Sequence, residues 1–143
     1  TVQEQGVAWS SKNMLLLGVI VAVGLLVHLY HFWFNMQLQE VLGNHHTVVD
    51  PNISPVDGAA LIRLYFSQPV YVVIYLVWFA AIWFHLTHGM WSMMHSVGWA
   101  NKKWYPRLKA VANVLATLIM LGFASIVVYF FLDSLGVFCS LCI

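Results

Sequence analysis

The sequence contains very few charged residues. Lysine, arginine, aspartate and glutamate make up 8% of the 143 residues, and hydrophobic residues make up 62%. A soluble domain carries about 25% charged residues, so this composition excludes an ordinary water-soluble domain. The net charge of +1 leaves neither a basic field for nucleic acid nor an acidic tail. The composition instead predicts a chain for which lipid is the main solvent.

Cysteine is also scarce, since Cys139 and Cys142 are the only two. They cannot form a disulfide framework, although their spacing is that of a redox pair. A membrane thiol–quinone oxidoreductase is therefore an alternative function, but it would need a second cysteine pair that the sequence lacks. The chain starts at Thr1 without the features of a signal peptide. We expect either a processed start or the later part of a longer chain.

Three long apolar runs dominate what is present, at residues 13–37, 69–97 and 108–132. Each exceeds the roughly 20 residues that cross a ~30 Å hydrocarbon core. Backbone groups in lipid must be satisfied within the segment, so the runs predict helices. Pro69 and Pro106 suit helix starts, where the missing N–H costs nothing. The expected fold is an all-α transmembrane helical bundle, one membrane domain over residues 1–143 with three transmembrane helices.

The basic residues predict the orientation of these spans. Four of the six lie between residues 102 and 109, and Lys12 precedes the first span. The positive-inside rule then places Lys12 and the loop 98–107 in the cytoplasm. The loop 38–68, whose part 57–68 has the pattern of a short interfacial helix, and the C-terminus face outside. We expect a multi-pass protein of the inner (cytoplasmic) membrane.

Histidines within the spans are the main candidates for function, because ionisable side chains at membrane depth are rare and costly. His28 and His31 lie one helical turn apart, as do His85 and His88. His28 lies roughly 24 Å from the cytoplasmic end of its span, and His88 roughly 12–15 Å from that side. The two therefore belong to different layers. This predicts two metal centres, each of which needs a second ligand from elsewhere.

Haem fits such isolated histidines better than a bare metal ion does. A bare ion needs several converging ligands, but no acidic residue lies at mid-depth in a span. A haem supplies four nitrogens and asks only for axial imidazoles. Gly24 and Gly89 would let a porphyrin approach the backbone, and Ser92 could bond a propionate. The alternative is a haem-free anchor or transporter fragment, whose histidines only link helices.

Two segments resemble a known family. Val27-His28-Leu29-Tyr30 and the stretch from His85 to Lys109 (HLTHGMWSMMHSVGWANKKWYPRLK) resemble the dihaem cytochrome b membrane anchor of succinate dehydrogenase and fumarate reductase (succinate:quinone oxidoreductase, complex II), particularly of the Bacteroidetes type. The resemblance covers nearly the whole chain. It implies the last three helices of a five-helix bundle that holds two b haems.

The resemblance also implies roles for individual residues. His28 would be the axial ligand of the haem distal to the cytoplasm, and His88 that of the proximal haem. His85 and His31 would be neighbours of the haems. The first two helices of the family are absent here, so the partner ligands would come from those missing helices or another chain.

Partners and quinone follow from the same resemblance. An iron–sulfur subunit and a flavoprotein subunit would bind on the cytoplasmic side, and electrons would pass through the haems to or from menaquinone or ubiquinone. The sequence has no flavin or iron–sulfur motif, so this subunit would not bind the dicarboxylate. Quinone candidates are the polar and aromatic residues near either histidine: His31, Tyr30, Trp33 and Asn35 on one side, and Ser92, His95, Trp99 and Arg107 on the other.

Overall fold

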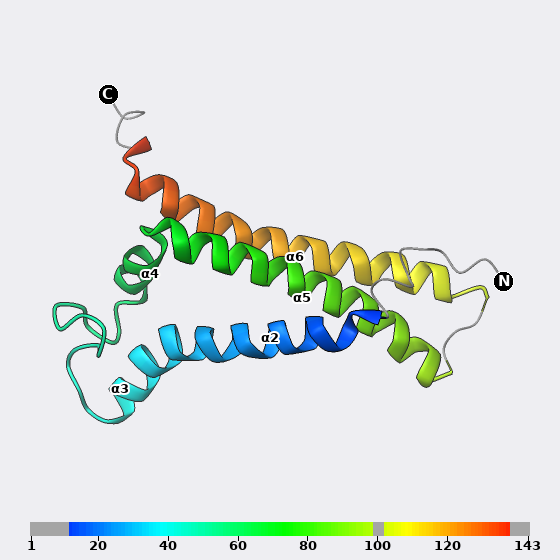
Figure 1. The fold of residues 1–143 in the computed structure, drawn as a ribbon, viewed down its shortest axis with the longest axis horizontal. Helices are drawn as coiled ribbons and strands as arrows, with labels where there is room; N and C mark the ends of the chain where they lie inside the picture. The colour runs from blue at the N-terminus through cyan, green and yellow to red at the C-terminus, as the bar shows by residue number, and fades with distance from the viewer. Residues whose placement is uncertain (1–11, 99–101, 138–143) are drawn as a thin grey trace. The chain divides into compact units, whose positions relative to one another are not determined.

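The computed structural model describes residues 12–98 and 102–137, and within them the chain is an all-α helical bundle. Its elements, drawn in Figure 1, are α2 (Met14–His28), the π-helix η1 (Leu29–Leu38), α3 (Gln39–Val41), α4 (Gly58–Phe66), α5 (Pro69–Ser96) and α6 (Tyr105–Ser134). Trp99, Cys139 and Cys142, which the sequence singled out, lie outside the described residues.

Within the described residues, three helical stretches are long and apolar enough to cross a membrane. They are Met14–Val41, Pro69–Ser96 and Tyr105–Ser134, with 28, 28 and 30 residues. At ~1.5 Å per residue an α-helix of this length rises roughly 40 Å, more than the hydrocarbon core of a bilayer. The protein is therefore a multi-pass membrane protein, as its composition predicted.

The ends of these helices differ from the predicted spans. The first stretch continues through η1 and α3 to Val41, so the loop after it begins at Leu42. The third starts at Tyr105, with Pro106 in its first turn, where a proline is tolerated. Part of the expected interfacial segment is helical as α4, and α5 begins at Pro69 as expected.

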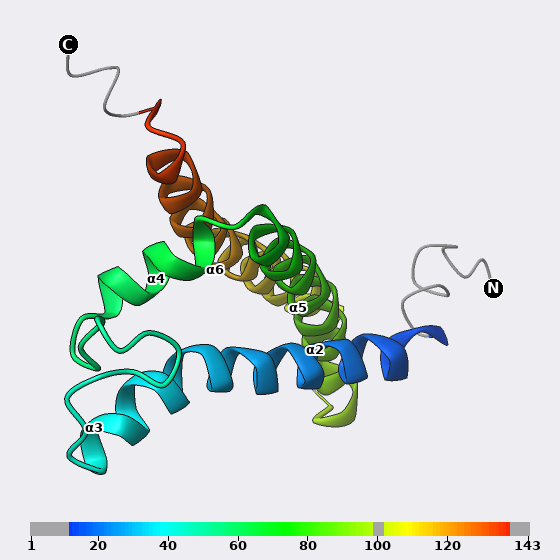
Figure 2. The ribbon, with the colours of Figure 1, turned by 60° about the vertical axis from the view of Figure 1, so that its left-hand side comes forward.

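The described residues divide into two compact units, each of which contains parts of the long helices. The first comprises the described residues up to Val21 together with those within Val77–Ala124. Within it, α5 and α6 run side by side in both views (Figures 1 and 2). The Trp83 indole N–H donates to the Thr117 hydroxyl on α6 at 2.9 Å. The Trp78 indole N–H donates to the Val21 carbonyl on α2 at 3.1 Å.

The second unit comprises Ala22–Leu76 and the described residues from Ser125 onward. It contains η1, the loop 42–57, α4, the first turns of α5 and the end of α6. Figure 2 shows α4 between this loop and the start of α5. Its core is mainly aromatic and aliphatic, comprising Leu61, Tyr65, Phe66, Val72, Tyr75 and Val127.

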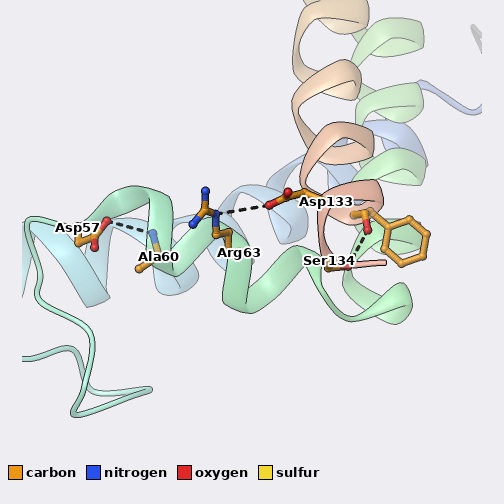
Figure 3. Close-up of polar contacts among 6 residues, drawn as sticks. Asp57, Ala60, Arg63, Asp133 and Ser134 are labelled. Atoms are coloured by element: carbon orange, nitrogen blue, oxygen red, sulfur yellow. Dashed lines mark hydrogen bonds and ion pairs between the residues drawn. The ribbon is translucent and has the colours of Figure 1, made fainter. Parts of the chain in front are cut away.

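Helix α4 is held at both of its ends. Asp57 is its N-cap, and the carboxylate accepts a hydrogen bond from the Ala60 N–H at 3.1 Å (Figure 3). Toward its C-terminus the Arg63 Nε lies 3.7 Å from the Asp133 carboxylate at the end of α6 (Figure 3). Tyr65 and Phe66 of this helix are buried in the core of the second unit.

Candidate functional site

The first histidine pair lies where helix geometry changes. His28 is the last residue of α2, and His31 lies in the first turn of η1. The His28 side chain is half-buried, with ring centroids 5.1 Å from Phe32 and 6.1 Å from Tyr75. π-helical turns are rare in proteins and frequently occur at functional sites. No sequence pattern indicated this change of geometry.

His31 is enclosed by tyrosines from two other elements. Its ring stacks on Tyr65 of α4 at 4.2 Å and meets Tyr71 of α5 edge-on at 5.2 Å. Its Nδ1 shares a 3.1 Å hydrogen bond with the Tyr75 hydroxyl, also on α5. Only 7% of the His31 surface is exposed. Of the two histidines, His28 is the less buried residue, although its Nδ1 atom is itself buried.

Tyr65, whose ring stacks on His31, carries an uncharged phenol. Its side chain is buried, and burial, followed by the nearby Tyr30 and Tyr71, raises the pKa of Tyr65 to about 12. The phenol therefore stays protonated over the whole physiological range. Sequence reasoning missed these tyrosines, because their only sequence signal is the spacing of four between Tyr71 and Tyr75.

Two buried amides continue the polar side of η1 beyond His31. The Asn35 amide donates to the carbonyls of Tyr30 at 2.9 Å and His31 at 3.2 Å. Its oxygen accepts the Val49 N–H at 3.2 Å, which ties the loop 42–57 to η1. One turn on, the buried Gln39 side chain donates to the Phe34 carbonyl at 3.2 Å. Asn35, a predicted quinone candidate, is fully buried and makes these structural bonds.

The second histidine pair lies in the other unit, on α5. His88 is half-buried, and its ring centroid lies 5.6 Å from Trp91. The His85 ring faces Gly18 of α2, where a Cβ would come within 3.4 Å of its Cε1. Among the described residues, His85 Nδ1 is buried without a hydrogen-bond partner. The His85 ring therefore lies against the α2 backbone at Gly18, a neighbour that sequence reasoning did not assign.

The small residues that were predicted to border a haem have different surroundings. Gly24 is half-buried and Ser92 is exposed. Gly89 is half-buried, and a Cβ there would meet the Met14 methyl at 3.8 Å, which is ordinary contact. The space beside Gly89 is thus lined by the end of a flexible side chain.

The remaining quinone candidates lie at exposed positions. Trp33 is about half exposed on η1. His95 is exposed, with its ring between Trp91 at 4.9 Å and Tyr105 at 5.2 Å. The Arg107 guanidinium lies 5.8 Å from the centroid of Trp104, a cation–π distance. His31 differs from these three because its ring is enclosed.

The donor set at each histidine pair suits a group that needs only axial imidazoles. Among the described residues, no three histidine, cysteine or acidic side chains come together as ligands for a metal ion. Half-buried imidazoles in apolar helices, as at His28 and His88, fit the axial position of a haem. Comparison with protein-family models, curated proteins and solved structures found no match for this chain.

Proposed function

We propose that the chain is the haem b-containing membrane-anchor subunit of a succinate dehydrogenase or fumarate reductase. It would pass electrons between an iron–sulfur subunit and a membrane quinone. The observation that carries the proposal is that His28 and His88 are half-buried histidines on separate stretches of apolar helix. The family resemblance of the sequence around both histidines adds to it.

The residues of this chain would have simple roles. His28 would hold the distal haem iron, and His88 the proximal one, each through a ring nitrogen. A bound haem b supplies reversible one-electron chemistry at its iron. The apolar side chains of the spans would exclude water, and each haem would take its second axial ligand from helices other than these three. Menaquinone or ubiquinone would be the electron partner in the membrane.

The same proposal assigns the membrane and the partners. The basic loop would face the cytoplasm and meet the iron–sulfur subunit, which in turn binds the flavoprotein subunit. The outer loop and C-terminus would face the other side of the inner membrane. These assignments rest on the basic residues at 102–109 and on the resemblance.

A reduced-minus-oxidised visible spectrum of the purified complex tests the proposal. The wild-type complex is expected to show a b-type band from two haems. His28→Ala should remove one haem, and His88→Ala should remove the other. The control His46→Ala, at an exposed position in the loop, should remove neither haem. Absence of any b-type band would contradict the haem assignment. Loss of the same centre in both variants would contradict the two-layer arrangement.

A haem-free membrane anchor is the second candidate function. The hydrogen bond between His31 and Tyr75 favours it, because here one span histidine does link two helices. In that case, His28→Ala and His88→Ala would change the stability of the protein without changing its visible spectrum. The same samples therefore separate the two candidates.

A further inference from the structure

Tyr75 contacts both histidines of the first pair. Its hydroxyl shares the 3.1 Å hydrogen bond with His31 Nδ1, and its ring lies edge-on to His28 at 6.1 Å and 70°. Tyr75 is 3% exposed and His31 is 7% exposed, so neither group exchanges this bond for one with solvent. The Tyr75 side chain of α5 therefore holds His31 through a hydrogen bond and contacts the ring of His28.

The His31 ring is also fixed from the side of α4. Tyr65 stacks on it with an interplanar angle of 23°. Phe32, the next residue along η1, contacts both His28 at 5.1 Å and Tyr75 at 6.2 Å. The rings of His28, Phe32 and Tyr75 thus form a closed set of contacts beside the His31 hydrogen bond.

The chain between the two histidines is the start of the π-helix. His28 is the N-cap residue of η1, and its own backbone is still α-helical with φ −61° and ψ −44°. The direction of the His28 ring relative to η1 therefore depends on the first π turn, which contains His31. A π-helix of 10 residues is unusual, because π geometry occurs mostly as single turns inside α-helices.

We propose that Tyr75 and His31 are positioning residues that set the direction of the His28 imidazole. The hydrogen bond between them holds the first turn of η1, and the Tyr75 ring limits rotation of His28. The proposal rests on the proposed function in that His28 is then an axial ligand. Outer groups that orient a ligating histidine change the electronic properties of the metal that it binds.

The test uses the full complex in membranes and the variant Tyr75→Phe, which keeps the ring and removes only the hydroxyl. Both haems should remain bound. The haem that His28→Ala removes should change its midpoint potential and the low-spin signal of its ferric form in electron paramagnetic resonance. The haem that His88→Ala removes should keep both properties. Tyr71→Phe is the matched control, because the Tyr71 ring meets His31 edge-on without the bond that Tyr75 makes.

Substitutions of His31 keep the proposal testable if Tyr75→Phe loses the distal haem. Gln at this position retains an acceptor for the Tyr75 hydroxyl, whereas Leu does not. His31→Gln should therefore retain the haem and its signal, and His31→Leu should not. Equal loss in both variants would overturn the positioning role, as would unchanged potential and signal in Tyr75→Phe.

Amide hydrogen exchange separates failure of this inference from failure of the proposed function. In Tyr75→Phe, the amides of residues 29–38 should exchange about fivefold faster, as expected for loss of one net hydrogen bond. In Tyr71→Phe they should not. A wild-type protein without haem would reject the proposed function, while equal exchange in the two variants would reject the role of Tyr75 in holding η1.

Discussion

Replacing Asn35 by leucine should destabilise the second unit, because Asn35 joins η1 to the loop 42–57. The side chain is fully buried and makes hydrogen bonds of 2.9, 3.2 and 3.2 Å to Tyr30, His31 and Val49. Leucine has a similar size but can make none of these bonds. In the leucine variant, the Val49 N–H no longer has a side-chain acceptor for its hydrogen bond.

The expected magnitude follows from these three bonds. A net hydrogen bond contributes about 0.5–1.5 kcal/mol, and side-chain bonds within membrane proteins lie toward the lower end. Burial of the leucine side chain offsets part of the loss. The free energy of unfolding should therefore fall by about 1–3 kcal/mol. The amide of Val49 should also lose protection against hydrogen exchange.

Reversible unfolding in mixed detergent micelles, followed by tryptophan fluorescence, measures this change on the full chain. Asn52→Ala is the control, because Asn52 is exposed and its side chain bonds only Asp50 within the loop at 3.0 Å. That variant should change the free energy of unfolding by less than about 0.5 kcal/mol. Equal unfolding midpoints for the two variants, with unchanged exchange at Val49, would refute the reasoning.

Two further predictions concern α4. Burial raises the pKa of Tyr65 to about 12, above the value of about 10 for an unfolded tyrosine, so the fold favours the neutral phenol. Its contribution to stability is present below pH ~10 and is lost as the pH rises toward 12. Absorbance titration at alkaline pH should show a group near 12 that Tyr65→Phe removes; removal of a group titrating near 10 would be contrary to this. Arg63→Gln should lower the free energy of unfolding by less than about 1 kcal/mol, because the Arg63 and Asp133 side chains are 65% and 36% exposed. A loss above about 2 kcal/mol in the same micelle assay would show that Arg63 has a further role.

The sequence alone was sufficient to predict the three apolar helices, because helix formation in lipid is a local requirement. Every backbone N–H and C=O in a span must be satisfied by its neighbours in the same segment. The start of α5 at Pro69 was predictable for a similar reason, since proline acts on its own turn. The positions of His28, His31, His85 and His88 within the spans were also evident from the sequence.

The surroundings of those histidines were decided by tertiary structure. Tyr65 and Tyr75 enclose His31 from positions 34 and 44 residues away in the sequence, and no periodicity within the first span could reveal them. The contacts of η1 were also decided by tertiary structure. The Asn35 amide bonds carbonyls within the helix, but its oxygen accepts a hydrogen bond from the Val49 N–H in the loop.

The sequence by itself therefore determined which segments enter the membrane and which of them carry imidazoles. Only the tertiary structure decided that His31 is enclosed and bonded while His28 is half-buried. The physical reason is that membrane insertion depends on the summed hydrophobicity of one segment. The environment of a ring instead depends on packing between elements that are distant in the chain.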